Sequence, residues 1–165
     1  MPNHIENLIA SAYNLRISYG DLLLQDSKLH TLLQRLNKTI SATINEMESV
    51  GVVKECADCA VHGEGTCCGI RTGYKCDRIL ILLNLLLDVS PVIQTRHPHL
   101  CPFLTEQGCS LRARPVICVN FICQRLRRNI THEGLVRLQE IAGEELDALF
   151  NAEEYVKKKI ASISL

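Results

Sequence analysis

The sequence predicts an all-α protein, a small helical bundle with a cysteine-rich metal-binding loop region at one end. Three observations favour this class. Apolar residues recur with helical spacing in long stretches. Little of the chain shows the alternation of apolar and polar residues that is typical of a strand, and nine cysteines fall into two blocks. The chain has 165 residues, of which 47% are hydrophobic, which is enough for one compact core. We therefore expect a single domain over residues 1–165.

Residues 1–50 are predicted to form a helical hairpin. A short amphipathic pattern opens the chain, and Gly20-Asp21 is typical of a helix stop and restart. In the second helix the core-facing positions alternate strictly by four and three, which places them on one face as a packing seam. This seam consists of Leu29, Leu33, Leu36, Ile40, Thr43, Met47 and Val50.

Residues 51–125 are predicted to form the cysteine-cluster core. Gly51 closes the long helix, and the glycine-rich stretch up to Gly73 lacks apolar periodicity, so we expect a loop that contains the first cysteine block. The stretch from Tyr74 to Leu87 is apolar around its whole circumference, which predicts a central buried helix. Pro115 is expected in the first turn of a helix that includes the last two cysteines.

Residues 126–165 are predicted to form a long C-terminal amphipathic helix, because apolar residues recur at helical spacing from Leu135 to Ile160. The longest aliphatic run, from Ile79 to Leu87, is interrupted by Asn84. It falls well short of the roughly 20 residues that a helix needs to cross a bilayer. We therefore expect no membrane span.

Charge and the N-terminal residues bear on partners and compartment. The chain has 18 basic and 18 acidic residues, so no net field would attract phosphate backbones and no nucleic acid is expected. The N-terminus lacks the basic and apolar regions of a secretory signal, which favours a cytoplasmic location where thiols stay reduced. An odd number of cysteines cannot pair completely within one chain.

The cysteine pattern indicates a metal or cluster site. The two-residue spacer between Cys56 and Cys59 lets both sulfurs approach one metal centre. Adjacent side chains diverge, so Cys67-Cys68 is better suited to two metal ions or to different irons of a cluster. Cys76, beside the apolar helix, fits a buried core residue as well as a ligand, and it is the odd cysteine left out of the predicted ligand set. The predicted ligands are Cys56, Cys59, Cys67, Cys68, Cys101, Cys109, Cys118 and Cys123.

Other polar side chains lie close to the cysteine blocks in sequence. His62, His97 and His99 are nitrogen donors that would complete a mixed zinc site, although a single histidine is more often a surface residue. Basic residues beside thiolates either offset cluster charge or form a solvated helix end, and the second is the commoner case. The basic residues near the second block are Arg112, Arg114, Arg125, Arg127 and Arg128.

Taken in order, the cysteine motifs resemble the cysteine-cluster family known as the zinc- or iron-chelating CxxCxxCC domain, over residues 56–123. The resemblance implies a bound zinc ion or iron–sulfur cluster with the matching cysteines as ligands, and it implies no reaction. Seven residues separate Cys59 from Cys67, where the family has two or three. The matching motifs are Cys56-x-x-Cys59, Cys67-Cys68, Cys101-Pro102-Phe103-Leu104, Gly108-Cys109-Ser110-Leu111 and Arg114-Pro115-x-x-Cys118 with Phe121 and Cys123.

The predicted function is metal binding by cysteine thiolates, with an iron–sulfur cluster or zinc as the cofactor and an associated redox or electron-transfer role. The alternative is a zinc-stapled helical protein–protein interaction module that uses the Leu29–Val50 seam for a protein partner or a second copy. A thiol redox enzyme is disfavoured because the Cys-x-x-Cys pair does not open a helix in a βαβ unit. No catalytic residue is assigned, and whether the protein is an enzyme is left open.

Overall fold

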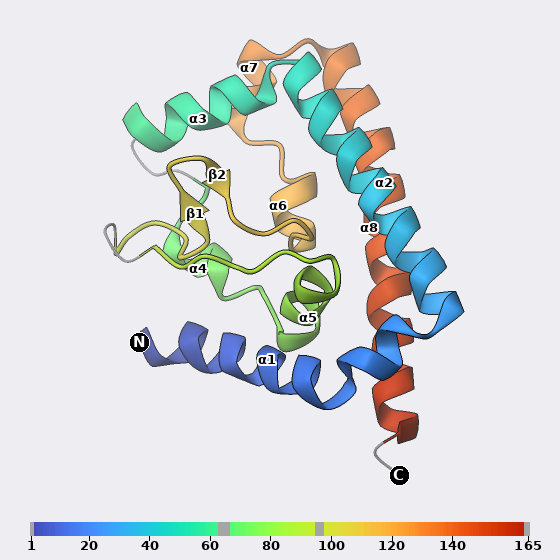
Figure 1. Ribbon diagram of the computed structural model, residues 1–165. Coiled ribbons are helices and arrows are strands. Elements are labelled where there is room, and N and C mark those ends of the chain that lie inside the picture. Colours follow the sequence, from blue (N-terminus) through green and yellow to red (C-terminus); the bar gives the residue numbers. More distant parts are fainter. Residues whose placement is uncertain (1, 63–66, 95–97, 164–165) are drawn as a thin grey trace.

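The computed structural model describes residues 2–62, 67–94 and 98–163, and it confirms the all-α prediction (Figure 1). A small antiparallel sheet joins β1 (Leu104–Thr105) to β2 (Gly108–Cys109). The helices are α1 (Pro2–Leu24), α2 (Ser27–Ser49), α3 (Val52–His62), α4 (Ile70–Gly73), α5 (Arg78–Leu86), α6 (Val116–Asn120), α7 (Gln124–Asn129) and α8 (His132–Ile163).

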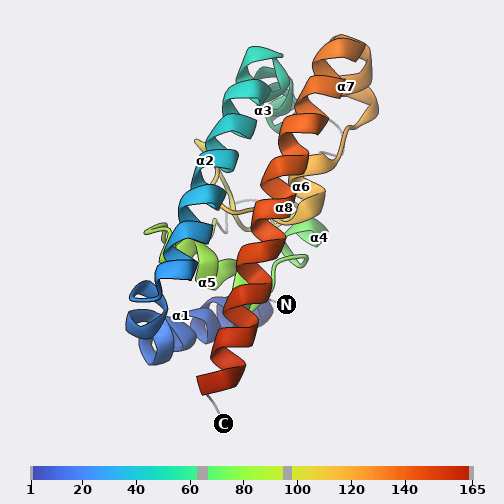
Figure 2. The same ribbon diagram turned by 90° about the vertical axis from the view of Figure 1, so that its right-hand side faces the viewer.

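The long helices α2 and α8 run side by side in opposite directions and form one whole side of the molecule (Figure 2). The predicted seam of α2 is confirmed, since all of its members except the half-buried Val50 are buried. Ion pairs follow the edges of the pair from one end to the other, including Lys159 with Asp26 at 2.7 Å and Arg137 with Glu46 at 2.6 Å. Burial of the seam by α8 explains why α2 is stable, because an amphipathic helix depends mainly on tertiary packing.

Helix α1 does not form the predicted hairpin with α2. It continues through Gly20 to Leu24, and it packs mainly against α5 while α2 packs against α8. The side chain of Arg16 lies across Gly20, where a Cβ atom would come within 1.9 Å of its guanidinium, so a glycine is accommodated inside the helix. The chain restarts instead at Asp26, whose carboxylate accepts a hydrogen bond from the backbone N–H of Leu29 at 3.0 Å.

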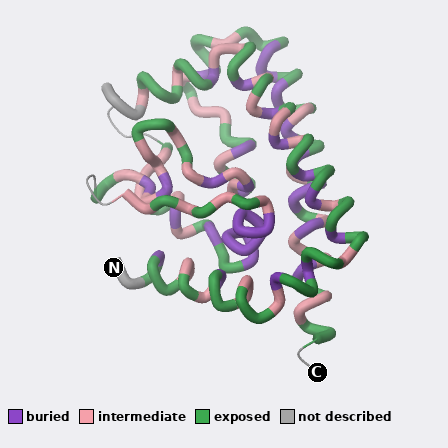
Figure 3. Tube along the Cα trace, in the orientation of Figure 1, coloured by how far each residue is buried: buried purple, intermediate pink, exposed green. Residues whose placement is uncertain are grey.

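Helix α5 is the central element, and every residue from Ile79 to Leu86 is buried (Figure 3). The prediction of a buried helix is confirmed, although the helix begins at Arg78 and not at Tyr74. Asp77 sets this start, because its carboxylate accepts hydrogen bonds from the N–H groups of Ile79 and Leu80 at 2.9 and 2.8 Å. Within the part of the chain that the structure describes, no helix combines the length and apolar character needed to cross a membrane.

Two predictions for the cysteine segments are wrong. The expected first loop begins with helix α3, which starts directly after Gly51; that glycine ends α2 in the left-handed conformation, with φ at 87°. The expected single helix after Pro115 is divided into α6 and α7, because the backbone is extended at Phe121 and at Cys123. In Figure 1, α3, α4, the β1–β2 hairpin, α6 and α7 lie on one side of the α2–α8 pair.

Candidate metal centre

Five of the nine cysteines line one cavity of about 20 Å³. Its other walls include Glu55, Arg125 and Leu126. The lining cysteines come from α3, from the segment before α4 and from the N-cap position of α7. They are Cys56, Cys59, Cys67, Cys68 and Cys123. We call Cys56, Cys59, Cys67 and Cys123 the outer group.

Helix α3 presents the Cys-x-x-Cys pair to the cavity. Residues three apart in a helix lie on the same face, so Cys56 and Cys59 are neighbours there. Cys67 lines the same cavity despite the long spacer that separates it from Cys59. Both halves of the first cysteine block therefore line the same cavity.

An ion-pair network joins α3 to α7 beside this cavity. The guanidinium of Arg125 donates to Glu55 at 2.8 Å and also contacts the carboxylate of Asp58. The side chain of Asn129 donates to the same Glu55 oxygen at 2.7 Å. Glu55 and Asp58 lie next to the two cysteines of α3, while Arg125 lies two residues after Cys123. The network therefore fixes the position of Cys123 relative to the Cys-x-x-Cys helix.

The other cysteines form a second set around the β hairpin, which we call the inner group. The strand register places Leu104 opposite Cys109, and the backbone N–H of Cys101 donates to the carbonyl of Cys68 at 2.7 Å. Burial, followed by the neighbouring cysteines, raises the pKa of the two remaining members, and Cys67 of the outer group is among the neighbours that act on Cys118. The inner group consists of Cys76, Cys101, Cys109 and Cys118, and Cys68 lies between the two groups, since it lines the cavity and interacts electrostatically with Cys118 and Cys101.

Backbone N–H groups lie close to two cysteines of the inner group. Burial raises the pKa of the Cys101 and Cys109 thiols, and the backbone N–H groups of Phe103 and Leu104 at Cys101 and of Leu111 at Cys109 act in the opposite direction. Such N–H groups favour the thiolate over the thiol, because they stabilise the charged form. They also orient ligand sulfurs around a metal.

Burial and neighbouring thiols shift the pKa of the cysteines in both directions. A hydrogen bond from the Cys68 thiol lowers the pKa of Cys67 to about 6. Burial, followed by the charges of Cys67 and Cys123, raises the pKa of Cys56 to about 11, even though the residue keeps exposed surface. Burial, followed by the charges of Cys109 and Cys101, raises the pKa of Cys118 to about 12. Thiols whose pKa is raised in this way are protonated at neutral pH. A bound cation would reverse the balance, because its charge favours the thiolate.

Arg114 is the arginine that acts on the thiols of both groups. Its charge lowers the pKa of Cys56, Cys109 and Cys118, although burial outweighs it in all three. Its guanidinium lies 3.9 Å from the sulfur of Met47, so the side chain of Arg114 packs against α2. Arg112 has a different role, since its side chain binds Asn37 and Ser41 of α2.

Asn84 positions the segment that leads to Arg114, and the sequence analysis noted it only as an interruption of the apolar run. It is fully buried in α5. Its side-chain N–H group donates to the carbonyl of Ala113 at 2.9 Å, and its oxygen accepts from the N–H groups of Arg112 and Ala113 at 2.7 and 3.0 Å. A lone amide inside an otherwise apolar helix was the feature that could have revealed it, because a buried amide needs partners.

All nine cysteines are free thiols. Within the described residues, no three side chains of His, Cys, Asp or Glu are already arranged to hold a metal ion. Metal binding would therefore draw the sulfurs together as they lose their protons. His99 is exposed and does not line the cavity, while His97 and the side chain of His62 lie outside the described residues.

Comparison with known proteins finds no matching family model, no similar curated protein and no similar solved structure. The resemblance to the zinc- or iron-chelating family therefore rests on the motif residues alone and stays a prediction.

Proposed function

We propose that the protein binds a zinc ion or an iron–sulfur cluster through its cysteine thiolates. The observation that carries this proposal is the cavity lined by five free cysteines from three separate stretches of the chain. Core packing does not explain this set, because a cysteine that only fills space in a core has no reason to lie beside other cysteines. The Cys-x-x-Cys spacing and the motif resemblance support the same proposal.

The cavity of the outer group has room for a single ion such as zinc. A volume of about 20 Å³ has room for about one water-sized sphere. A single ion fits into such a space, whereas a cluster with several irons and sulfides would require the walls to move apart. A zinc centre would tie α3, the Cys67-Cys68 segment and α7 together, and an iron–sulfur cluster would add the capacity for electron transfer.

We place the protein in a reducing compartment such as the cytoplasm, because thiols that act as metal ligands must stay reduced. A protein partner for the α2 seam is less favoured, since that seam is buried against α8 of the same chain. No residue is proposed as catalytic.

Metal analysis together with an absorption spectrum, on full-length protein purified without oxygen, tests the proposal. Zinc at about one or two ions per chain with a colourless solution is the result we expect. Iron with acid-labile sulfide and broad visible absorption would make the centre a cluster and give it a redox role. Protein that contains neither metal and takes up neither on reconstitution would overturn the proposal.

The double substitution Cys56→Ser, Cys123→Ser links the metal to the cavity. It removes two lining thiols from different elements, and we expect the metal content to fall. Ser41→Ala is the control, because it removes a hydroxyl from α2 and no thiol. Metal content unchanged in the double variant would exclude the cavity as the site.

A further inference from the structure

We propose that the outer face of α6 and the exposed arginines of α7 form a docking surface for a segment of another protein, in which apolar side chains are flanked by carboxylates. This surface contains no thiol, so it is separate from the metal ligands and does not depend on the proposed function. We call it the α6–α7 patch, and it consists of Val116, Ile117, Phe121, Arg127 and Arg128.

The apolar part of the patch is exposed although α6 itself is packed against the rest of the chain. Val119, on the inner side of α6, is 2% exposed, whereas Val116, Ile117 and Phe121 are 56%, 46% and 53% exposed. The backbone N–H of Phe121 donates to the carbonyl of Ile117 at 3.2 Å, so these two residues lie one helical turn apart. Large apolar side chains that gather at one place on a surface mark an interaction site, while single scattered ones do not.

The charge around these side chains has one sign. Residues 107–132 include five arginines and no Asp or Glu, although the whole chain has equal numbers of basic and acidic residues. Arg112 and Arg125 bind side chains of α2 and α3. Arg127 and Arg128 are exposed, and they form no ion pair with any described residue. Their positive charge therefore remains for the carboxylates of a partner.

Arg127 connects this charge to the apolar side chains. Its guanidinium lies 3.5 Å from the carbonyl of Ile122, the residue directly after Phe121. A partner that covers Phe121 therefore brings its own flanking residues close to a guanidinium, which pairs well with carboxylates. Aromatic and arginine side chains are also the types that contribute most to binding energy at protein interfaces.

A protein segment fits this patch better than a lipid surface does. Binding to anionic lipids is typical of clusters of about four to eight basic residues. The patch has two exposed arginines, and its apolar side chains come from a helix of five residues and the residue that follows it. An acidic segment with a few apolar side chains matches both its size and its charge.

Selection of a random peptide library on the immobilised full-length protein tests this inference. We expect the selected peptides to combine Leu, Ile or Phe with Asp or Glu. Fluorescence anisotropy then measures the affinity of one selected peptide for each variant. Phe121→Ser and Arg127→Glu should each weaken binding about tenfold or more, and high salt should weaken it as well.

Two variants outside the patch are the matched controls. Phe150→Ser removes a phenylalanine that is more exposed than Phe121 but lies on α8, and Arg78→Glu reverses an exposed arginine on α5. Both should leave the affinity for the peptide unchanged. Thermal unfolding of all four variants checks that each is folded, and we expect it to succeed because every substituted side chain is exposed.

Three results would overturn the docking surface. They are a library that yields no binding peptide, selected peptides that lack acidic residues, and an affinity that is equal in the wild type and in Phe121→Ser. Vesicles of phosphatidylserine and phosphatidylcholine test the lipid surface, and binding to these vesicles without any selected peptide would also overturn the proposal. The metal content of the same preparation tests the proposed function separately.

Discussion

The α2–α8 pair and the cysteine region differ in how the chain is held in place. The pair consists of helices of 23 and 32 residues whose buried faces meet along their length. Around the cysteines, α4, α6 and α7 have only four to six residues, and the strands have two each. Helices as short as these are not stable alone. The comparison indicates that the long buried faces stabilise the pair, while the short elements of the cysteine region depend on contacts with the rest of the chain, to which metal–thiolate bonds would add.

Metal removal is expected to have the largest effect, and to act on one region only. Structural zinc contributes binding free energy on the order of 10 kcal/mol. Removing it with a chelator should abolish amide hydrogen-exchange protection in residues 98–125 and leave protection in α2 and α8. Hydrogen exchange with mass spectrometry measures both regions in one sample. Equal loss of protection in both regions would mean that they do not differ as we infer.

Asn84→Leu tests the connection between the core and the cysteine region. The substitution leaves the N–H groups of Arg112 and Ala113 and the carbonyl of Ala113 without their buried partner. Because one unsatisfied buried group costs about 1–3 kcal/mol, we expect the free energy of unfolding to fall by about 3 kcal/mol. Metal affinity should fall as well, since the segment before Arg114 loses its anchor.

Denaturant unfolding and zinc titration measure the two effects of Asn84→Leu. Asn14→Leu is the matched control, because Asn14 is exposed on α1 and the change in chemistry is the same. A variant that loses stability but keeps its zinc affinity would show that Asn84 acts on the core alone.

Glu145→Met should strengthen the helical pair. Glu145 is 1% exposed on α8, and within the described residues its two carboxylate oxygens have no hydrogen-bond partner. Replacing an unpaired buried polar group with an apolar side chain of similar length should raise the free energy of unfolding by about 1–3 kcal/mol. Glu140→Met, an exposed position on the same helix, should change it by less than about 0.5 kcal/mol. Equal effects at the two positions would contradict the role of burial.

The sequence predicted the long helices and their buried faces better than the cysteine region, although it paired the second helix with α1 and not with α8. The seam from Leu29 to Met47 is a local periodic pattern and the apolar run of α5 is a continuous one, and local patterns determine helices and their buried faces. Glu145 lies on the same face of α8 as Leu138 and Leu149, and the sequence analysis did not single it out.

The remaining features depend on distant contacts. No periodic pattern relates Cys76 to Cys101, or α1 to α5, because the turn at Gly73 and the core around α5 bring them together. The same applies to the spacer before Cys67, whose length gave no indication that this cysteine shares a cavity with α3. Contacts of this kind follow from tertiary packing and not from spacing.

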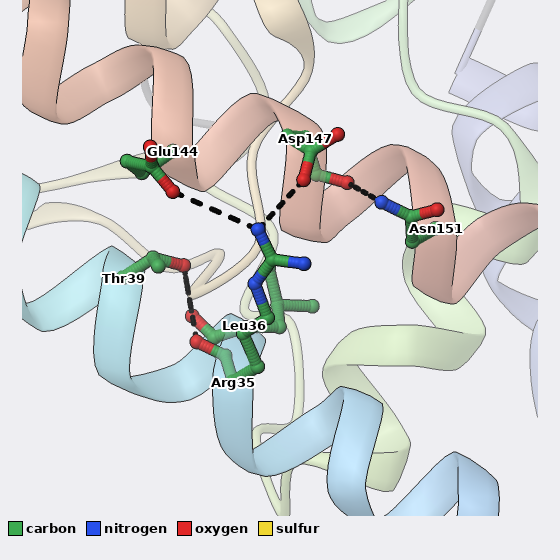
Figure 4. A network of polar contacts seen from close by, with 6 residues as sticks. All are labelled: Arg35, Leu36, Thr39, Glu144, Asp147 and Asn151. Atoms are coloured by element: carbon green, nitrogen blue, oxygen red, sulfur yellow. Dashed lines mark hydrogen bonds and ion pairs between the residues drawn. The ribbon is translucent and has the colours of Figure 1, made fainter.

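Arg35→Ala should have the smallest effect, and it sharpens the claim that burial holds the pair together. The guanidinium of Arg35 lies 2.7 Å from the Asp147 carboxylate and 3.6 Å from that of Glu144 (Figure 4). The arginine side chain is 46% exposed, so water and salt screen these pairs, and we expect a loss of less than about 1 kcal/mol. High salt should reduce the difference between wild type and variant further. A loss of several kcal/mol that persists in high salt would mean that ion pairs, and not the buried seam, join α2 to α8.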